Sequence, residues 1–334
     1  MYKILSIDGG GIKGVYPISF LASIEDTLSG KIGEYFDLIV GTSTGGIIAL
    51  GLGLGFSAND LLKFYEELGP EVFVKRENGV KRKTALFKGI SKKTDALIDN
   101  ISYLRQAKYD AEVLKRQVQL KFGERQLGES KTRLVIPSFN IGNGEPHVYK
   151  TSHHPRLQMD YRSKVVDVAL ATSAAPTYFQ THLSENNVPL VDGGVYANNP
   201  TGLAVVEAIS LLNWKPEDFK VLSVGCTNAP MDFDISKQDK GTIDWATKLK
   251  LIEIFMLAQS KQSMGTSYLL ANHRENNNIF RIDETVTNGK YGLDSIEFIE
   301  ELKGMGYARA RIEVPELRDV FFDKKASDFI PYHK

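Results

Sequence analysis

The sequence of 334 residues has a single cysteine, Cys226, and this scarcity excludes an internal disulfide framework and a cysteine-rich metal site. Cys226 follows the strand-like run of residues 220–225, so we expect it to be a buried structural thiol.

An excess of charge of one sign is also lacking, because 41 Lys and Arg residues balance 41 Asp and Glu residues. No overall field therefore attracts nucleic acid, and neither DNA nor RNA is an expected partner.

No apolar run is long enough to cross a membrane. The longest nearly unbroken run, Ile47–Phe56, is about half of the ~20 residues that a spanning helix requires. The first residues lack the apolar core and the cleavage site of a secretory signal peptide. The sequence therefore predicts a cytoplasmic protein that associates with membranes only peripherally.

Histidine is scarce, with 6 residues, and no group of histidine, cysteine or acidic residues has the spacing of a metal site. His147, His153 and His154 lie close together in the sequence, and we interpret them as loop histidines. No metal and no cofactor are therefore expected.

The stretch Tyr35–Gly46 predicts a buried strand, a sharp turn and the start of a helix. The turn reads Gly41-Thr-Ser43-Thr-Gly45. Such a turn between a strand and a helix is typical of a nucleophile elbow, in which strain and close backbones require glycine on both sides of the serine. Ser43 is therefore the candidate nucleophile, with Gly41 and Gly45 in support, and the alternative is an ordinary glycine-serine loop.

A glycine-rich loop, Asp8–Gly14, lies between a predicted first strand and a predicted helix. Its spacing, Gly9-x-Gly11-x-x-Gly14, matches a dinucleotide-binding fingerprint, although Val15 in place of lysine excludes a P-loop. Successive backbone N–H groups in such a loop can also form an oxyanion hole. With a serine elbow on the next strand, we favour the oxyanion hole, with Gly9, Gly10, Gly11 and Gly14 as its residues.

The third motif is Asp192-Gly193-Gly194, which follows the apolar run Val188–Val191. Because ligands of open α/β sheets bind beyond strand ends, we expect Asp192, Ser43 and the glycine loop to converge there. Asp192 can then accept the Ser43 proton directly or through water. The alternative is a common Asp-Gly turn.

A carboxylate is a weak base, so a Ser–His–Asp triad is the alternative to a dyad. His273 and His333 follow Asp192 in the chain, and His182 is nearest to it in sequence. Neither His273 nor His333 adjoins a predicted strand end or a supporting glycine turn, and His182 follows the stretch around Pro176. A dyad without histidine is therefore preferred.

The three motifs, in this order, resemble those of the patatin-like phospholipases, and residues 171–179 resemble the stretch that precedes the aspartate motif in that family. The resemblance covers residues 3–225. It implies hydrolysis of fatty acyl esters by Ser43 as nucleophile and Asp192 as base, with the glycine loop as oxyanion hole and no metal. Gly193 and Gly194 support the aspartate, and Gly194 stands where many members have alanine.

The sequence further resembles compact bacterial patatins, which include anti-phage effector phospholipases that cyclic oligonucleotides activate. The resemblance implies a cyclic oligonucleotide activator, and a phospholipid substrate at a membrane surface. A basic segment, 75–93, is a candidate anion-binding or membrane-docking surface, and a solvated loop is the alternative. A helix expected from Thr242 to about Leu270, with the following residues 272–275, is a candidate for a ligand pocket or for homo-oligomer contacts.

Together these features predict a three-layer patatin-like α/β fold with a mainly parallel central sheet flanked by helices. Residues 1–230 are expected to form the catalytic core, and residues 231–334 a C-terminal helical extension packed on the same domain. The predicted function is a lipid acyl hydrolase. A nucleotide-binding protein that uses the glycine loop and a catalytically silent patatin scaffold are the alternatives.

Overall fold

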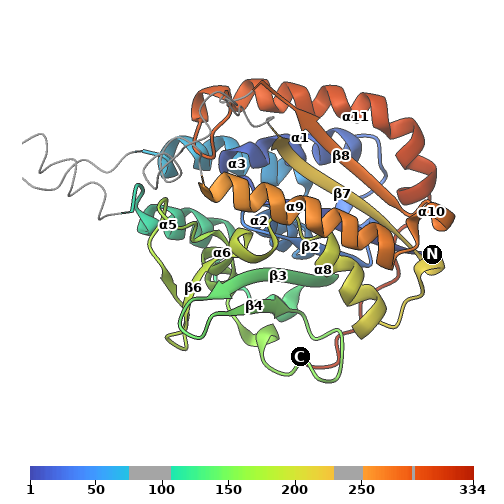
Figure 1. Cartoon of the computed structure of the whole chain (residues 1–334), viewed down its shortest axis with the longest axis horizontal. Helices are drawn as coiled ribbons and strands as arrows, with labels where there is room; N and C mark the ends of the chain where they lie inside the picture. Colours follow the sequence, from blue (N-terminus) through green and yellow to red (C-terminus); the bar gives the residue numbers. More distant parts are fainter. Residues whose placement is uncertain (75–106, 229–250, 288–289) are drawn as a thin grey trace, which may run out of the picture.

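The computed structural model describes residues 1–74, 107–228, 251–287 and 290–334 (Figure 1). Within them an eight-stranded sheet has the order β5-β6-β3-β2-β1-β7-β8, with β4 paired to β3. The strands are β1 (Tyr2–Ile7), β2 (Leu38–Gly41), β3 (Arg133–Asn140), β4 (Glu145–Lys150), β5 (His182–Leu183), β6 (Pro189–Asp192), β7 (Phe219–Asn228) and β8 (Ile279–Thr285).

The middle of the sheet is parallel. β1 pairs in parallel with β2 and β7, β2 with β3, and β7 with β8. The antiparallel pairs are those of β3 with β4 and β6, and of β5 with β6. The prediction of a mainly parallel sheet is therefore confirmed.

Helices cover both faces of this sheet (Figure 1). They are α1 (Val15–Glu25), α2 (Thr44–Gly53), α3 (Ala58–Val72), α5 (Ala111–Phe122), α6 (Val165–Ser173), α7 (Gly194–Ala197), α8 (Thr201–Val206), α9 (Leu251–Leu270), α10 (His273–Asn276) and α11 (Ile299–Phe321). Short 3-10 turns occur at Gly11–Gly14, Ile32–Tyr35, Leu127–Glu129, Asp160–Arg162, Pro216–Asp218 and Ile296–Phe298, and a π-helical turn at Glu207–Leu211.

Two apolar clusters explain why the strands are apolar on both faces. In β2, Ile39 packs into a cluster with α1, α2, α3, α5, α6 and α11, whereas its neighbours Leu38 and Val40 pack into a second cluster with α8. Alternate side chains of a strand point to opposite faces, so each face has its own core. The result is the predicted three-layer α/β arrangement.

Some of the segments for which the sequence predicts a structure or a role lie wholly or partly outside the described residues. The basic segment 75–93 lies outside them, as do residues 242–250 of the helix expected from Thr242 to about Leu270. The described part of that helix is α9, which ends at Leu270 as expected.

The predicted division of the chain at residue 230 stays a prediction. The described residues beyond it supply the helices α9 and α11 and also the edge strand β8 of the common sheet. None of the helices in the described ranges has both the length and the hydropathy that a membrane crossing requires.

Candidate active site

Ser43 lies in a strained turn between β2 and α2. Its backbone has φ 55 and ψ −122, in the left-handed region that residues with a side chain rarely adopt. The two flanking glycines permit the turn, because an added Cβ would lie 2.1 Å from the Gly45 carbonyl oxygen at Gly41 and 2.3 Å from the Ile7 carbonyl oxygen at Gly45. The turn thus has the geometry of a nucleophile elbow at the N-terminus of α2.

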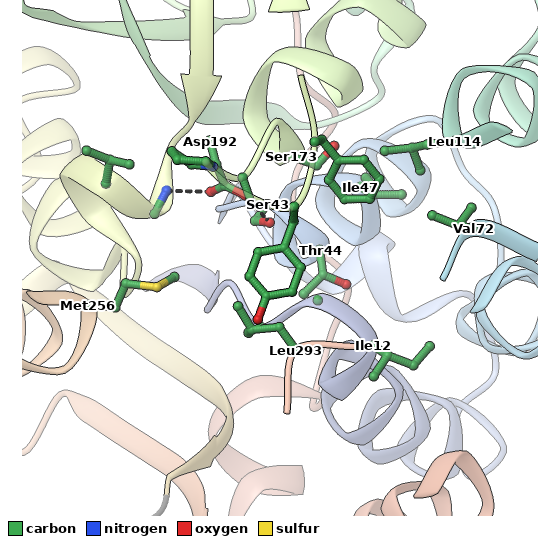
Figure 2. Close-up of a pocket in the computed structure, with 18 of the residues that line it drawn as sticks. Ile12, Ser43, Thr44, Ile47, Val72, Leu114, Ser173, Asp192, Met256 and Leu293 are labelled. Atoms are coloured by element: carbon green, nitrogen blue, oxygen red, sulfur yellow. Dashed lines mark hydrogen bonds between the residues drawn. The ribbon is translucent and has the colours of Figure 1, made fainter. Parts of the chain in front are cut away.

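The Ser43 hydroxyl donates to Asp192 Oδ2 at 2.6 Å, with no residue between them. The other carboxylate oxygen, Oδ1, accepts the Gly194 N–H at 2.6 Å, while the Gly193 N–H donates to the Thr172 carbonyl oxygen at 3.1 Å. Figure 2 shows Asp192 and Ser43 directed toward one another at the wall of a cavity. These contacts fix the orientation of the carboxylate with respect to the hydroxyl.

Asp192 is only 3% exposed. Burial raises its pKa to about 6, although the hydrogen bonds from Ser43 and Gly194 oppose the rise. A carboxylate with this pKa is a stronger base than an exposed aspartate and is still ionised at neutral pH.

Asp192 does not follow a parallel strand of the sheet, as we expected, because β6 runs antiparallel to β3. Val40 of β2 is level with Val135 of β3, and three residues further along β3, Ser138 is level with Asp192. β3 therefore extends past the end of β2 to the level of Ser43. β6 pairs with this extension and runs from Asn140 back to Ser138, so that its last residue, Asp192, lies beside Ser43. The motifs converge as predicted, but the aspartate comes from the opposite direction.

The glycine loop lies directly against Ser43. A Cβ added at Gly9 would be 3.2 Å from Ser43 Cβ, and one added at Gly14 would be 2.1 Å from Thr44 Oγ1. The Gly9 N–H donates to the Asn198 carbonyl oxygen at 2.9 Å, so it is already engaged.

The free donors of the loop are those of Gly10 and Gly11. Neither N–H has a hydrogen-bond acceptor among the described residues, and both glycines line the same cavity as Ser43 and Asp192. Two adjacent free N–H groups beside a serine hydroxyl can bind an oxygen that becomes negative.

The cavity beside Ser43 has a volume of about 580 Å³. Its lining is mostly apolar and comes from α2, α3, α5, α6, α7, α9, the end of β6 and the loops at 10–12, 175–179 and 293. Figure 2 shows Leu114 and Val72 to one side of Ser43 and Met256 to the other. A long apolar group with a polar centre at Ser43 fits this shape.

The histidines lie elsewhere. His182 pairs with Asp167 at 2.6 Å and His153 with Glu207 at 2.8 Å. His273 Nδ1 accepts the Ile279 N–H at 3.2 Å, and His333 Nε2 lies 3.0 Å from the Pro155 carbonyl oxygen. No histidine lines the cavity of Ser43.

The single cysteine, Cys226, is buried as predicted, and burial raises the pKa of its thiol to about 12. Its side chain packs against Gly10, where an added Cβ would lie 2.4 Å from Sγ. Among the residues that the structure describes, no group of histidine, cysteine and acidic side chains could hold a metal ion.

The structure adds contacts that sequence reasoning missed. Thr172, fully buried on α6, accepts the Ser43 backbone N–H, and Arg281 on β8 pairs with Asp8 at the start of the glycine loop. The apolar helix α9 supplies Met256 to the cavity wall. Of these residues, only Thr172 has a sequence signal, because it lies in the stretch 171–179 that resembles the one before the aspartate motif of the patatin-like phospholipases.

The chain is similar in sequence to a known protein family and to several curated proteins. A family model described as patatin-like phospholipase matches residues 5–205. A cGAMP-activated phospholipase of Pseudomonas aeruginosa is 33% identical over 288 residues, covering 86% of this chain and 79% of that protein. A cGAMP-activated phospholipase of Vibrio cholerae is 36% identical over 237 residues, covering 67% of this chain and 63% of that protein.

Among solved structures, VipD from Legionella pneumophila matches with a TM-score of 0.49 and 14% sequence identity, covering 96% of this chain and 67% of that chain. The family match includes the glycine loop, Ser43 and Asp192, and it ends before β7 and β8.

Proposed function

This chain belongs to the patatin-like phospholipase family, whose members are serine hydrolases, and we propose that it cleaves fatty acyl esters of membrane phospholipids with a Ser43–Asp192 dyad. The observation that carries the proposal is the 2.6 Å hydrogen bond from the Ser43 hydroxyl to Asp192 Oδ2 at the wall of an apolar cavity. The free N–H groups of Gly10 and Gly11 at the same wall support it further.

The reaction begins when Asp192 accepts the hydroxyl proton as Ser43 Oγ attacks the ester carbonyl carbon. The carbonyl oxygen becomes negative, and the Gly10 and Gly11 N–H groups and the N-terminus of α2 stabilise that charge. When the tetrahedral intermediate collapses, the leaving alcohol takes the proton from Asp192. Water then attacks the acyl-enzyme with Asp192 as base. When the bond between the acyl carbon and Ser43 Oγ breaks, the fatty acid leaves and Asp192 returns the proton to Ser43 Oγ.

The expected substrate follows from the cavity. Its mostly apolar lining suits a fatty acyl chain, while the hydroxyl of Ser43 and the carboxylate of Asp192 lie in its wall. A polar head group would remain outside, at the membrane surface, so the enzyme would act peripherally from the cytoplasm. The same lining argues against the glycine loop as a nucleotide site, because phosphates need polar partners.

The relatives from Pseudomonas aeruginosa and Vibrio cholerae are both named cGAMP-activated phospholipases, and we extend this regulation to the present chain as a proposal. A phospholipase that responds to a cyclic oligonucleotide spares its own membrane until a signal arrives, as an anti-phage effector requires. A ligand can activate only by binding the active state more tightly than the resting state. Association of several copies of the chain also stays a prediction.

The test is turnover of p-nitrophenyl acyl esters and of phospholipid vesicles, with and without a panel of cyclic di- and trinucleotides. Ser43→Ala should abolish turnover. Ser173→Ala is the matched control, because Ser173 lines the same cavity but donates its hydroxyl to the Ala169 carbonyl oxygen at 2.6 Å.

A fluorophosphonate should label Ser43 alone. Labelling at another serine, or unchanged turnover in Ser43→Ala, would refute the nucleophile. Calorimetry on Ser43→Ala protein separates nucleotide binding from turnover. High basal activity without any binding heat would remove only the regulation.

A further inference from the structure

We infer that Arg281 is a positioning residue of the oxyanion hole, which it holds in place through Asp8. The inference rests on the proposed function, since it concerns the geometry of the same reaction. Arg281 does not line the cavity of Ser43, and it lies well beyond residues 5–205, where the family model matches.

The contact between Arg281 and Asp8 is a two-pronged ion pair. Nη1 donates to Asp8 Oδ1 at 2.9 Å, and Nη2 donates to Asp8 Oδ2 at 2.6 Å. Nη1 also donates to Ser223 Oγ at 2.8 Å and Nη2 to Asp283 Oδ2 at 3.0 Å. The guanidinium is therefore anchored to β7 and β8, and its planar fork holds the carboxylate in one orientation.

Asp8 is the last residue before the glycines, so its position sets where the loop begins. Its N–H donates to the Val224 carbonyl oxygen at 3.0 Å, and its side chain is 6% exposed. Burial raises the pKa of Asp8 to about 6 even though Arg281 opposes the rise. Removing the arginine would leave a buried carboxylate without its countercharge, which is strongly unfavourable unless the backbone moves toward water or the group takes up a proton.

A second contact from the same part of the chain holds the other end of the loop. The Leu293 carbonyl oxygen accepts the Ile12 N–H at 2.8 Å, and it lies so close to Gly11 that an added Cβ would be 2.2 Å away. Asp294, the next residue, accepts hydrogen bonds from Lys108 Nζ and the Tyr109 hydroxyl. Gly10 and Gly11 are thus held between Arg281 on one side and Leu293 on the other.

Small displacements of the Gly10 and Gly11 N–H groups should reduce the rate of the reaction strongly. Oxyanion donors act at about 2.7–3.1 Å from the developing negative oxygen. A displacement of about 1 Å can reduce a rate by roughly 10²-fold. The N–H groups of Gly10 and Gly11 have no acceptor of their own among the described residues. The contacts of the neighbouring residues 8, 9, 12 and 13, of which Arg281 supplies the one to the Asp8 side chain, therefore decide where these N–H groups point.

The experiment compares Arg281→Met, Arg281→Lys and Asp8→Asn with the wild-type chain. Arg133→Met is the matched control, because Arg133 is a half-buried arginine of the same sheet that donates to the Asp37 carbonyl oxygen at 3.1 Å and does not line the cavity. We expect kcat on p-nitrophenyl esters to fall by about 10²-fold in Arg281→Met, with KM changed by less than about threefold. Arg281→Lys keeps the charge and should recover part of the loss.

A second readout separates positioning from a general loss of structure. A trifluoromethyl ketone forms a tetrahedral adduct with the serine and needs the oxyanion hole, whereas a fatty acid product needs only the cavity. Affinity for the ketone should fall in proportion to kcat in the Arg281 variants, and affinity for decanoate should not. Equal losses for both ligands, or an unchanged kcat in Arg281→Met, would overturn the inference.

Hydrogen exchange provides a measurement that does not depend on turnover. The N–H groups of Gly9, Ile12 and Lys13 are hydrogen bonded and report on the loop. In Arg281→Met they should exchange about 10-fold faster, while those of α2 stay unchanged. If the wild-type chain showed no esterase activity, the proposed function would fail, and unchanged exchange in the loop would still refute the role of Arg281 separately.

Discussion

The Ser43 backbone N–H donates to the Thr172 hydroxyl oxygen at 3.0 Å, and that hydroxyl donates in turn to the Pro137 carbonyl oxygen at 2.6 Å. Thr172 is fully buried on α6, and it thus joins the strained turn of the nucleophile to the β3 extension beside Asp192. A residue with positive φ persists only where its surroundings hold it there. Thr172 is one of the contacts that do so.

Thr172→Val keeps the shape of the side chain and removes both hydrogen bonds. We expect the free energy of unfolding to fall by about 1–3 kcal/mol, because a buried N–H and a buried carbonyl lose their partner. We also expect kcat to fall by roughly 10-fold, because the Ser43 turn is less constrained.

Thr151→Val is the matched control for this variant. Thr151 is equally buried, and its hydroxyl oxygen accepts the Leu134 N–H at 2.9 Å and lies 2.9 Å from His153 Nδ1, away from the cavity. It should lose stability but keep kcat. A Thr172→Val protein with wild-type kcat would show that the turn does not need this contact.

The pH dependence of the reaction should follow the ionisation of Asp192. The base must be unprotonated to accept the Ser43 proton, and burial raises its pKa to about 6. We therefore expect kcat/KM to be constant above about pH 7 and to decline as the pH falls through about 6.

Asp8 has a pKa raised to about the same value, again mainly by burial, so its contribution must be separated. The profile of Asp8→Asn should keep a midpoint near pH 6 if Asp192 is the base. A profile that stays flat down to pH 4 in both proteins would contradict the assignment.

The same raised pKa has a consequence for stability. Because the folded state binds the Asp192 proton more tightly than the unfolded chain does, the free energy of unfolding falls as the pH rises from about 4 to about 6. In Asp192→Asn, the neutral amide removes the free-energy cost of burying the ionised carboxylate. We expect it to be more stable than wild type at pH 7.5, by up to about 3 kcal/mol, and the difference to vanish near pH 4.

Asp218→Asn, which changes an exposed carboxylate, should shift stability by less than about 0.5 kcal/mol at either pH. The check is chemical denaturation of the three proteins at the two pH values. An Asp192→Asn protein that is less stable at pH 7.5 would mean that the hydrogen bonds of the carboxylate outweigh its desolvation.

Leu114 should help to determine the length of the acyl chain. It lies on α5 and lines the cavity on the side away from Met256 (Figure 2). Leu114→Ala removes three carbon atoms from that wall, so the ratio of kcat/KM for a longer ester over a shorter one should rise by about 10-fold. The measurement uses a series of p-nitrophenyl esters of increasing chain length.

Val118→Ala is the control for Leu114→Ala, because Val118 is buried on the same helix and does not line the cavity. It should lose stability without changing the chain-length profile. Identical profiles for Leu114→Ala and the wild-type chain would place the end of the acyl chain elsewhere.

The elements of the site that were predictable are those with a local physical cause. The Ser43 turn is encoded by its two glycines, and the apolar β2 before it is encoded by burial on both faces of the sheet. The glycine loop and the aspartate motif are equally local. Because each motif lies next to a strand end, their approach to one another followed from the expected α/β fold.

The remainder depends on pairing between distant segments, which local patterns do not specify. The antiparallel direction of β6 is decided by its register with β3, and the partner of Asp8 lies 273 residues away. Gly9 was expected to donate to the oxyanion, yet its N–H meets the Asn198 carbonyl oxygen, from a segment with no sequence signal for that contact. Thr172 lies in the stretch 171–179 that the sequence singled out, but its contact with the Ser43 N–H had no sequence signal.

The most direct test of the dyad is the kcat of Ser43→Ala, Asp192→Asn and the double variant, with His182→Gln as the control for a histidine base. If the two residues act as a unit, each single variant should lose at least about 10³-fold and the double variant should be no worse. His182→Gln should keep most activity, since His182 bonds with Asp167 and not with Ser43. Retention of activity by Asp192→Asn together with its loss in His182→Gln would contradict the dyad.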